Sequence, residues 1–310
     1  MAVTAKRALR HRLTLHVVKA LVWVSAHLPL RLSHALGGAL GALGWHVGGR
    51  TRLVTERNLA LCLPELDEHA RRRLARESFV EMGKTLLEAG ALWSWPKERV
   101  TALATQVSGR ELIDDAIAAG RGVILAAPHL GAWEMVGLYW STQHRITSLY
   151  RPPRLAALDS PIQHGREHLG AQLVPTDASG VRALLQALKR GQIAGILPDQ
   201  EPPAEGGGVF APFFGVPAWT MRLLTRLAQR SNAVVVFCYA ERLPRGRGFH
   251  IHVLPARAHI SDDDPLIAAT ALNLGVEQCA RACPAQYQWS YKRFRKRPAG
   301  EKSVYRRGGR

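Results

Sequence analysis

The chain has few cysteines and no long clean apolar run. Its 310 residues include four Cys, and these offer no second pair at the spacing of a zinc site. We therefore expect reduced thiols, as in a protein that faces the cytosol, and no metal held by cysteine. A stretch of about 20 uninterrupted apolar residues, which would cross a bilayer, is also absent. No small-residue cleavage site follows the first apolar segment, so a cleaved signal peptide is not expected.

Acidic residues are scarce at both ends of the chain. The net charge of +18 is divided into +8 for residues 1–60, +8 for residues 292–310 and only +2 for residues 61–291. A basic body would suggest a groove for nucleic acid, whereas basic ends on a nearly neutral body favour an anionic surface or an acidic partner. We therefore predict no nucleic-acid partner. The alternative is that the charged ends serve only solubility.

The first 49 residues combine a basic flank with an interrupted apolar segment. Trp23 and Trp45 lie in this segment, and Pro29 and Arg31 break it. This composition is typical of a helix that lies in the membrane interface. Residues 1–49 are therefore predicted to be a membrane-associated segment, and the alternative is a soluble helical hairpin packed on the body.

The body has the pattern of an α/β domain. A long helix is expected between Asp67 and Gly90, followed by a linker near residues 94–108. Short apolar runs then alternate with helical segments, which indicates a mixed sheet flanked by helices. The predicted strands lie at 122–128, 145–150, 170–175, 192–199, 233–240 and 249–255, and the last two are expected to form a hairpin. The long Gly- and Pro-rich stretch at 201–220 is predicted to be a loop whose aromatic residues line an alkyl groove, and the alternative is a loop packed down by its own aromatic residues.

One His-x-x-x-x-Glu pair is the strongest candidate for chemistry. Histidine is readily poised as a base near neutral pH, and a carboxylate is its usual orienting partner. With 13 His and 24 acidic residues, about one such pair is expected by chance, and the chain holds two: His129 with Glu134, and His259 with Asp264. The second pair lies in a polar stretch that is typical of a loop and a helix cap.

The surroundings favour His129. The run before it is typical of a buried strand, and the run after it is typical of a helix. Five helical residues turn about 500°, so His129 and Glu134 can meet only if His129 lies in the turn before the helix, which Gly131 permits. Glu134 would then orient His129 from the first helical turn. The alternative is a core histidine bonded to a backbone carbonyl.

Further polar residues follow predicted strands. Arg151, Asp199 and Arg242 join His129 at such positions, and ligands of open α/β sheets usually bind beyond the carboxyl ends of the strands. A crevice formed by these residues is therefore expected. Each could instead have a purely local task, as a surface ion pair, a loop cap or a solvated turn.

Several sequence blocks together resemble the bacterial lipid A biosynthesis acyltransferases. They are RNLALCLPEL (57–66), APHLGAWE (127–134), YRPP (150–153), ILPDQEPPAEGGGVFAPFFGVPAWT (196–220) and QYQWSYKRFRKRP (286–298). The His-x-x-x-x-Asp/Glu motif alone is shared with other glycerolipid acyltransferases, whereas its combination with the last two blocks is specific. Glu201 departs from the pattern, since many relatives carry Asp there.

The resemblance implies a glycerol-phosphate-acyltransferase-like fold with an acyltransferase domain at 50–298 and a basic tail at 299–310. It implies transfer of a fatty acyl chain from acyl carrier protein to a hydroxyl of a lipid A precursor, without a cofactor or metal. His129 would be the general base, oriented by Glu134. Arg151, Asp199, Gln200 and Arg242 would bind the anionic acceptor.

The resemblance also implies a place at the inner (cytoplasmic) membrane, with the catalytic domain facing the cytoplasm. Arg293, Arg295, Lys296 and Arg297 would meet the acidic carrier protein or the phosphorylated acceptor. Two alternatives remain open: acylation of another glycolipid, such as a phosphatidylinositol mannoside, and a non-catalytic membrane-binding protein with a degenerate site.

Overall fold

The computed structural model describes residues 19–20, 22–153, 158–202 and 206–305. The basic flank at residues 6–12 and the last five residues of the tail lie outside this part. The N-terminal half holds α2 (Leu30–Val47), α3 (Gly49–Cys62), α4 (Glu68–Ser94), α5 (Lys97–Thr101), β1 (Ala104–Ser108), α6 (Glu111–Ala118), β2 (Val123–Ala126), α7 (Trp133–Ser141) and β3 (Ile146–Tyr150). The C-terminal half holds α8 (Asp159–Glu167), β4 (Gln172–Pro175), α9 (Ala178–Lys189), β5 (Ile193–Ile196), β6 (Gly208–Phe213), β7 (Val216–Met221), α10 (Leu223–Ser231), β8 (Val234–Arg242), β9 (Phe249–Pro255), α11 (Pro265–Ala282) and the short 3₁₀ turns η2 (Pro244–Gly246) and η3 (Pro284–Gln286).

The main sheet is mixed and has seven strands in the order β1-β9-β8-β2-β5-β3-β4. The pairs on either side of β2, β5 and β3 are parallel, and β8 and β9 form the predicted antiparallel hairpin. All four residues of β2 are buried, because helices cover both faces of the sheet. The mixed α/β architecture predicted from the sequence is therefore confirmed.

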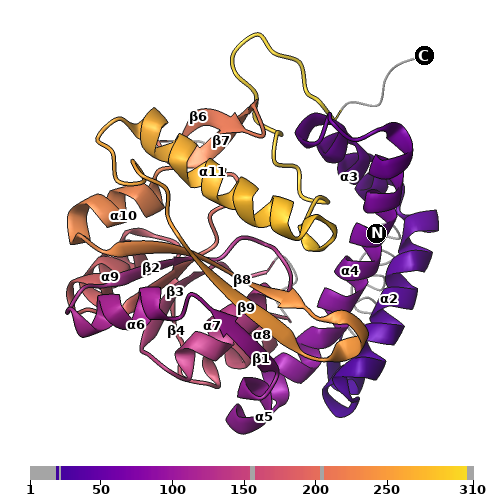
Figure 1. Ribbon diagram of the computed structural model, residues 1–310, viewed down its shortest axis with the longest axis horizontal. Helices are drawn as coiled ribbons and strands as arrows, with labels where there is room; N and C mark the ends of the chain where they lie inside the picture. The colour runs from indigo at the N-terminus through magenta and orange to yellow at the C-terminus, as the bar shows by residue number, and fades with distance from the viewer. Residues whose placement is uncertain (1–18, 21, 154–157, 203–205, 306–310) are drawn as a thin grey trace, which may run out of the picture.

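Two layers of helices cover the sheet. Helices α9, α10 and α11 lie over one face, and α6 and α7 lie over the other (Figure 1). Each face has its own core: Phe237, Leu184 and Leu272 belong to the first, and Trp140, Leu125 and Ile113 belong to the second. Strand β2 separates the two cores, and its carboxyl end leads directly into the candidate site.

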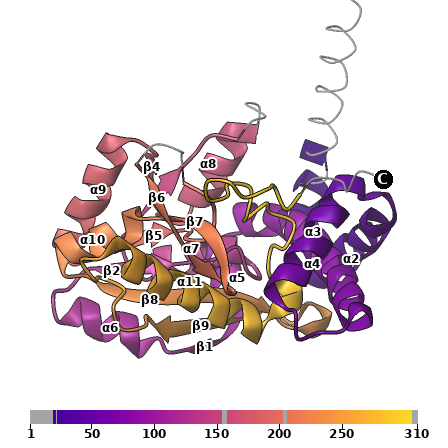
Figure 2. The same cartoon turned by 90° about the horizontal axis from the view of Figure 1, so that it is seen from above.

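The N-terminal helices form a third unit beside these layers (Figure 2). Helices α2 and α4 pack so closely that a Cβ atom on Gly41 would lie 2.1 Å from the carbonyl oxygen of Phe79. A Cβ atom on Gly83 would likewise lie 2.0 Å from the carbonyl oxygen of Gly37. Glycines that interrupt the apolar character of α2 thus have a packing reason, because they allow two helix backbones to approach.

The long helix begins and ends close to the predicted positions. Asp67 caps α4 by accepting a hydrogen bond from the backbone N–H of Ala70 at 2.7 Å. Within the described ranges, no helix combines the length and the apolar character that a bilayer crossing requires.

Two segments differ from the sequence-based prediction. The stretch expected to be a linker at 94–108 contains α5 and the edge strand β1, and β1 pairs with β9. Part of the predicted loop at 201–220 forms the two-stranded β6–β7 hairpin, in which Pro212 is paired with Pro217. Because proline cannot donate a hydrogen bond to the ladder, these two prolines argued against strands in the sequence-based prediction. Helix α11 packs on the hairpin that they form.

Candidate active site

His129 lies in a tight turn between β2 and α7, as predicted. Gly131 has φ +59° in this turn, and a Cβ atom there would lie 2.0 Å from the carbonyl oxygen of Ala240. The backbone N–H groups of Gly131 and Ala132 donate to the carbonyl oxygens of Gln286 and Ala240 at 3.1 and 2.8 Å. The turn is therefore held by backbone bonds to β8 and to the segment after α11, and Gly131 is required by the close approach.

The two ring nitrogens of His129 have different partners. Nδ1 lies 2.8 Å from Oδ1 of Asp199, whose Oδ2 also accepts from the backbone N–H of His129 at 3.0 Å. Nε2 lies 3.1 Å from the side-chain amide nitrogen of Gln200. Because the carboxylate can only accept, the proton of the neutral ring is on Nδ1, and Nε2 carries the lone pair. This arrangement leaves Nε2 able to take a proton from a hydroxyl.

Asp199 is suited to hold His129 in this tautomer. The residue is 4% exposed, and burial by itself raises the pKa of its carboxyl group. The neighbouring His129 outweighs burial, through its charge when protonated and its hydrogen bonds, so the pKa of Asp199 lies below its ordinary value. The sequence placed Asp199 and Gln200 in the acceptor site, whereas the structure places both against the imidazole ring.

Glu134 has a different partner from the predicted one. It lies in the first turn of α7 as expected, but its carboxylate binds the guanidinium of Arg166 at 2.5 and 2.9 Å and accepts from Trp93 Nε1 at 3.2 Å. Burial raises the pKa of Glu134, but the charge and hydrogen bonds of Arg166, together with hydrogen bonds from Trp93 and Trp133, lower it to below its ordinary value. The orienting carboxylate of His129 is therefore Asp199, because the turn directs His129 toward β5 while Glu134 faces α8.

An apolar groove begins beside His129. The ring of Trp133 lies 5.2 Å from the imidazole, measured between centroids, and Trp133 also lines this groove. The empty space of the groove, including its open mouth, is about 610 Å³. Most of its walls are apolar, many of them from α7, β3 and β5, and Glu134, Ser148 and Arg166 provide the polar part. A long apolar group bound there would end next to Trp133 and the imidazole of His129.

Comparison with known proteins decides the family. The family model of the bacterial lipid A biosynthesis acyltransferases matches residues 3–296. The chain belongs to this family. A lipid A biosynthesis lauroyltransferase of Escherichia coli (strain K12) is 32% identical over 285 residues, which are 92% of each chain. A lipid A biosynthesis palmitoleoyltransferase of the same strain is 27% identical over the same share.

The chain is therefore an acyltransferase, as the sequence predicted. A more distant similarity extends to a phosphatidylinositol mannoside acyltransferase of Mycobacterium tuberculosis (strain CDC 1551 / Oshkosh). That protein is 28% identical over 164 residues, which are 51% of this chain and 50% of the relative.

Arg242 of the acyltransferase is not placed to meet an acceptor. It is 4% exposed, and its guanidinium binds both carboxylate oxygens of Glu88 at 2.6 and 2.7 Å. It also donates to the carbonyl oxygen of Gly131 at 2.7 Å. Arg242 thus joins α4 to the His129 turn and has a structural task in place of the predicted substrate contact. Arg151, by contrast, is exposed at the end of β3.

The basic C-terminal segment of the acyltransferase is less available than its sequence suggested. Arg293 is 3% exposed and donates to the Trp219 carbonyl oxygen, so it fixes the β6–β7 hairpin and does not face a partner. Arg295 pairs with Glu201 at 3.1 Å but keeps 68% of its side chain exposed. Arg297 pairs with Glu301, and Lys296 lies 3.3 Å from the Trp219 ring centroid.

The competing His259 and Asp264 pair is local, as its sequence indicated. His259 bonds Asp262 at 3.2 Å, and Asp264 caps α11 by accepting from the backbone N–H of Leu266. The sequence missed Arg166 and Trp93, because neither follows a predicted strand and their contact with Glu134 depends on how α8 and α4 meet α7. It also missed the link from His129 to Asp199, although both residues followed predicted strands.

Proposed function

We propose that this acyltransferase moves a fatty acyl chain from the thioester of acyl carrier protein to a hydroxyl of a lipid A precursor, with His129 as the general base. The observation that carries the proposal is the pairing of His129 Nδ1 with buried Asp199, which leaves the lone pair on Nε2, where it can accept a proton once the Gln200 amide is displaced. The names of the relatives that cover 92% of the chain support the acceptor class.

The reaction follows from this geometry. The acceptor hydroxyl displaces the amide of Gln200 at Nε2 and gives its proton to the ring as its oxygen attacks the thioester carbonyl carbon. Asp199 stabilises the imidazolium that forms. When the carbon–sulfur bond breaks, the imidazolium returns the proton to the departing thiolate. The acyl group passes directly to the acceptor, so no covalent acyl-enzyme forms.

The groove beside Trp133 is the proposed site of the acyl chain. Its apolar walls suit a hydrocarbon, and its few polar side chains suit the polar end of a lipid. Arg166, which is paired with Glu134 and keeps 29% of its side chain exposed, also lines the groove and can meet the polar end of a lipid or of the donor. Arg151 is the exposed cation that we propose for the anionic acceptor.

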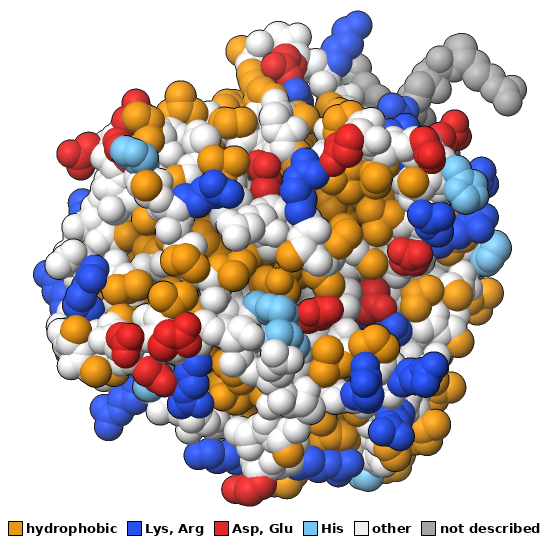
Figure 3. Space-filling model, viewed as in Figure 1, with side chains coloured by type: hydrophobic (Ala, Val, Ile, Leu, Met, Phe, Trp, Pro, Cys, Tyr) orange, Lys and Arg blue, Asp and Glu red, His pale blue; other side chains and the backbone are white. Residues whose placement is uncertain are grey.

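A membrane surface is the proposed location. Leu32, Leu36, Leu40 and Leu43 on α2 are 43–61% exposed, and they recur at the spacing of one helix face. Val24, which is 43% exposed, lines one apolar hollow together with Leu36, Leu40 and Leu43. Exposed cations lie before α2 (Lys19), on α2 (Arg31) and at the start of α3 (Arg50). Lys and Arg side chains lie on the side of the molecule where α2 to α4 lie, among Asp and Glu side chains, and elsewhere on the same face (Figure 3). Exposed leucines flanked by cations suit the interface of an anionic bilayer at the cytoplasmic face of the inner membrane.

The decisive experiment is an acyl-transfer assay with the full chain, acyl carrier protein thioesters and two acceptors. We expect acylation of the lipid A precursor and none of a phosphatidylinositol mannoside, and His129→Ala should abolish it. Activity on the mannoside alone would replace the proposed acceptor with the more distant alternative. Undiminished turnover of His129→Ala would refute the base.

A further inference from the structure

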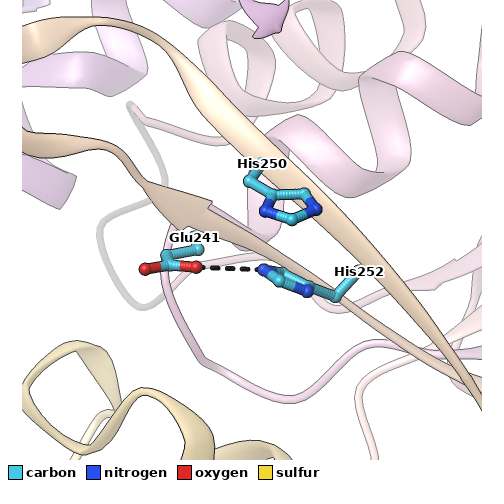
Figure 4. Close-up of side chains that lie close together, drawn as sticks. All are labelled: Glu241, His250 and His252. Carbon is cyan, nitrogen blue, oxygen red and sulfur yellow. Dashed lines mark hydrogen bonds and ion pairs between the residues drawn. The ribbon is translucent and has the colours of Figure 1, made fainter. Parts of the chain in front are cut away.

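Three potential metal ligands meet on the β8–β9 hairpin, outside the proposed active site. His250 and His252 are two residues apart on β9, so they share one face of the strand, and Glu241 lies directly opposite His250 on β8. Figure 4 shows the three side chains directed toward one another. Across the described residues, this is the one group of three His, Cys, Asp or Glu side chains close enough to hold an ion.

The distances in the group are close to those of a coordination sphere. One ligand atom from each of the three residues lies within 4.8 Å of the others, and Nε2 of His252 is 3.0 Å from Oε2 of Glu241. Ligands of a tetrahedral zinc ion are about 3.3 Å apart, given bonds of about 2.0–2.1 Å. Small rotations of side chains that are partly exposed (20% for His252 and 37% for Glu241) reach this geometry.

Neighbouring side chains hold the two rings in place. The Ser108 hydroxyl lies 2.8 Å from Nε2 of His250, which leaves Nδ1 of that ring for an ion. The ring of His252 stacks on Tyr239 with centroids 4.6 Å apart and an angle of 14° between the planes. The two imidazole centroids are only 3.7 Å apart. Histidine ligands of metals usually carry such an outer hydrogen bond, which fixes the ring and its tautomer.

We propose that Glu241, His250 and His252 bind one Zn²⁺ ion, with water in the fourth position. Two imidazoles and one carboxylate are a ligand set that zinc favours, whereas Mg²⁺ and Ca²⁺ prefer oxygen ligands alone. The cysteine spacings predicted no zinc site. The His-x-His sequence at 250–252 is uninformative until the register places Glu241 beside it.

The ion would cross-link β8 to β9, because Glu241 lies on the first strand and both histidines lie on the second. Glu241 precedes Arg242, whose side chain lies on the other face of β8 and bonds the Gly131 carbonyl oxygen. A ligand that binds only the folded state stabilises it by mass action, so zinc is expected to raise the melting temperature of the protein. None of the three ligands has a hydrogen bond to His129, Asp199 or Glu134 within the described ranges, so acyl transfer should continue without zinc.

The test is isothermal titration of the full chain, free of any histidine tag, with Zn²⁺, alongside the absorption spectrum of the Co²⁺ form. We expect one zinc ion per chain and the intense visible bands of four-coordinate cobalt. His250→Ala, His252→Ala and Glu241→Gln should each weaken binding by about tenfold or more. His259→Ala removes an exposed histidine paired with a single carboxylate and should leave binding unchanged.

Melting temperatures measured in a chelator establish that each variant is folded, and only folded variants are compared. Glu241→Gln keeps the shape of the side chain and provides the least disruptive variant. The proposal is overturned if the wild-type chain binds no zinc, if the folded variants bind it as tightly as the wild type does, or if cobalt shows only weak octahedral bands.

Discussion

The imidazole of His129 is polarised by two neighbours of different chemistry. A buried carboxylate at Nδ1 and an amide at Nε2 fix which nitrogen holds the proton. Replacement of Asp199 by Asn keeps the shape of this partner and reverses the preferred tautomer. We predict that Asp199→Asn lowers kcat by about 10³–10⁴-fold with a smaller change in KM.

Steady-state kinetics with the acyl carrier protein thioester would measure this loss. Asp264→Asn, which retains an acceptor at the cap of α11, is the matched control and should keep wild-type kcat. If Asp199→Asn retained wild-type kcat, Asp199 would have no part in proton transfer.

Gly137 is a second residue at which a substitution would test the proposed site, here through the length of the acyl chain that is transferred. It lines the groove, and a Cβ atom built on it meets no atom within 4 Å. A larger side chain would therefore enter the groove, while the helix tolerates or prefers residues other than glycine. We predict that Gly137→Leu shifts transfer toward shorter acyl chains, and that Gly137→Ala shifts it less.

Competition between thioesters of several lengths, followed by mass spectrometry of the product, measures this shift. A Gly137→Leu variant with normal activity and an unchanged chain-length profile would place the acyl chain elsewhere.

At the scale of elements, an ion-pair network joins α2, α4 and β8. Glu88 of α4 accepts from Arg242 of β8 and from His34 of α2, the latter at 3.0 Å. Burial raises the pKa of Glu88, but Arg242 and His34 lower it further, so the carboxyl group has a pKa below its ordinary 4.5. Its stabilising effect is therefore complete above pH 4.5, the value in the unfolded chain, and is lost as the pH falls through the lower folded pKa.

Glu88→Gln removes the nearer of the two carboxylates that pair with the buried Arg242 guanidinium and leaves only the longer contact with Glu81 at 3.4 Å. We predict that this substitution lowers the free energy of unfolding by about 3–5 kcal/mol at pH 7 and flattens its dependence on pH below 4.5. Chemical denaturation at several pH values measures both effects. Glu77→Gln, on the exposed face of α4, is the control and should change neither; an equal loss in both variants would contradict the assignment.

The elements that the sequence predicted well share strong local signals. The run from Val123 to Ser141 combines a fully apolar strand, a glycine turn and a helix, so its form and the place of His129 were predictable. Strand β1 was not, because the edge sequence Ala104–Ser108 is short and largely polar. The contact of His129 with Asp199 spans 70 residues and depends on β2 lying beside β5, which no local pattern reveals.

At the scale of the whole molecule, the exposed leucines of α2 form one side of the third helical unit. We predict that Leu40→Glu/Leu43→Glu abolishes sedimentation with anionic phospholipid vesicles, because both charges would have to enter the interface. Leu266→Glu/Ile267→Glu is the matched control, since these residues are 45% exposed on α11. Binding of the wild-type chain should weaken at high salt, because its cations are exposed. Equal binding by both variants would exclude α2 as the contact.

The backbone contact between α2 and α4 restricts how this family can be recombined. A Cβ atom on Gly83 would clash with the backbone of Gly37, and a Cβ atom on Gly41 would clash with the backbone of Phe79. The α2 backbone therefore fits against α4 only when both contact positions are glycine. A chimera that exchanges the N-terminal helix of one relative for that of another must therefore exchange the facing stretch of α4 as well. A graft of an α2 without these glycines would separate its backbone from α4 and break the ion pair of His34 with Glu88.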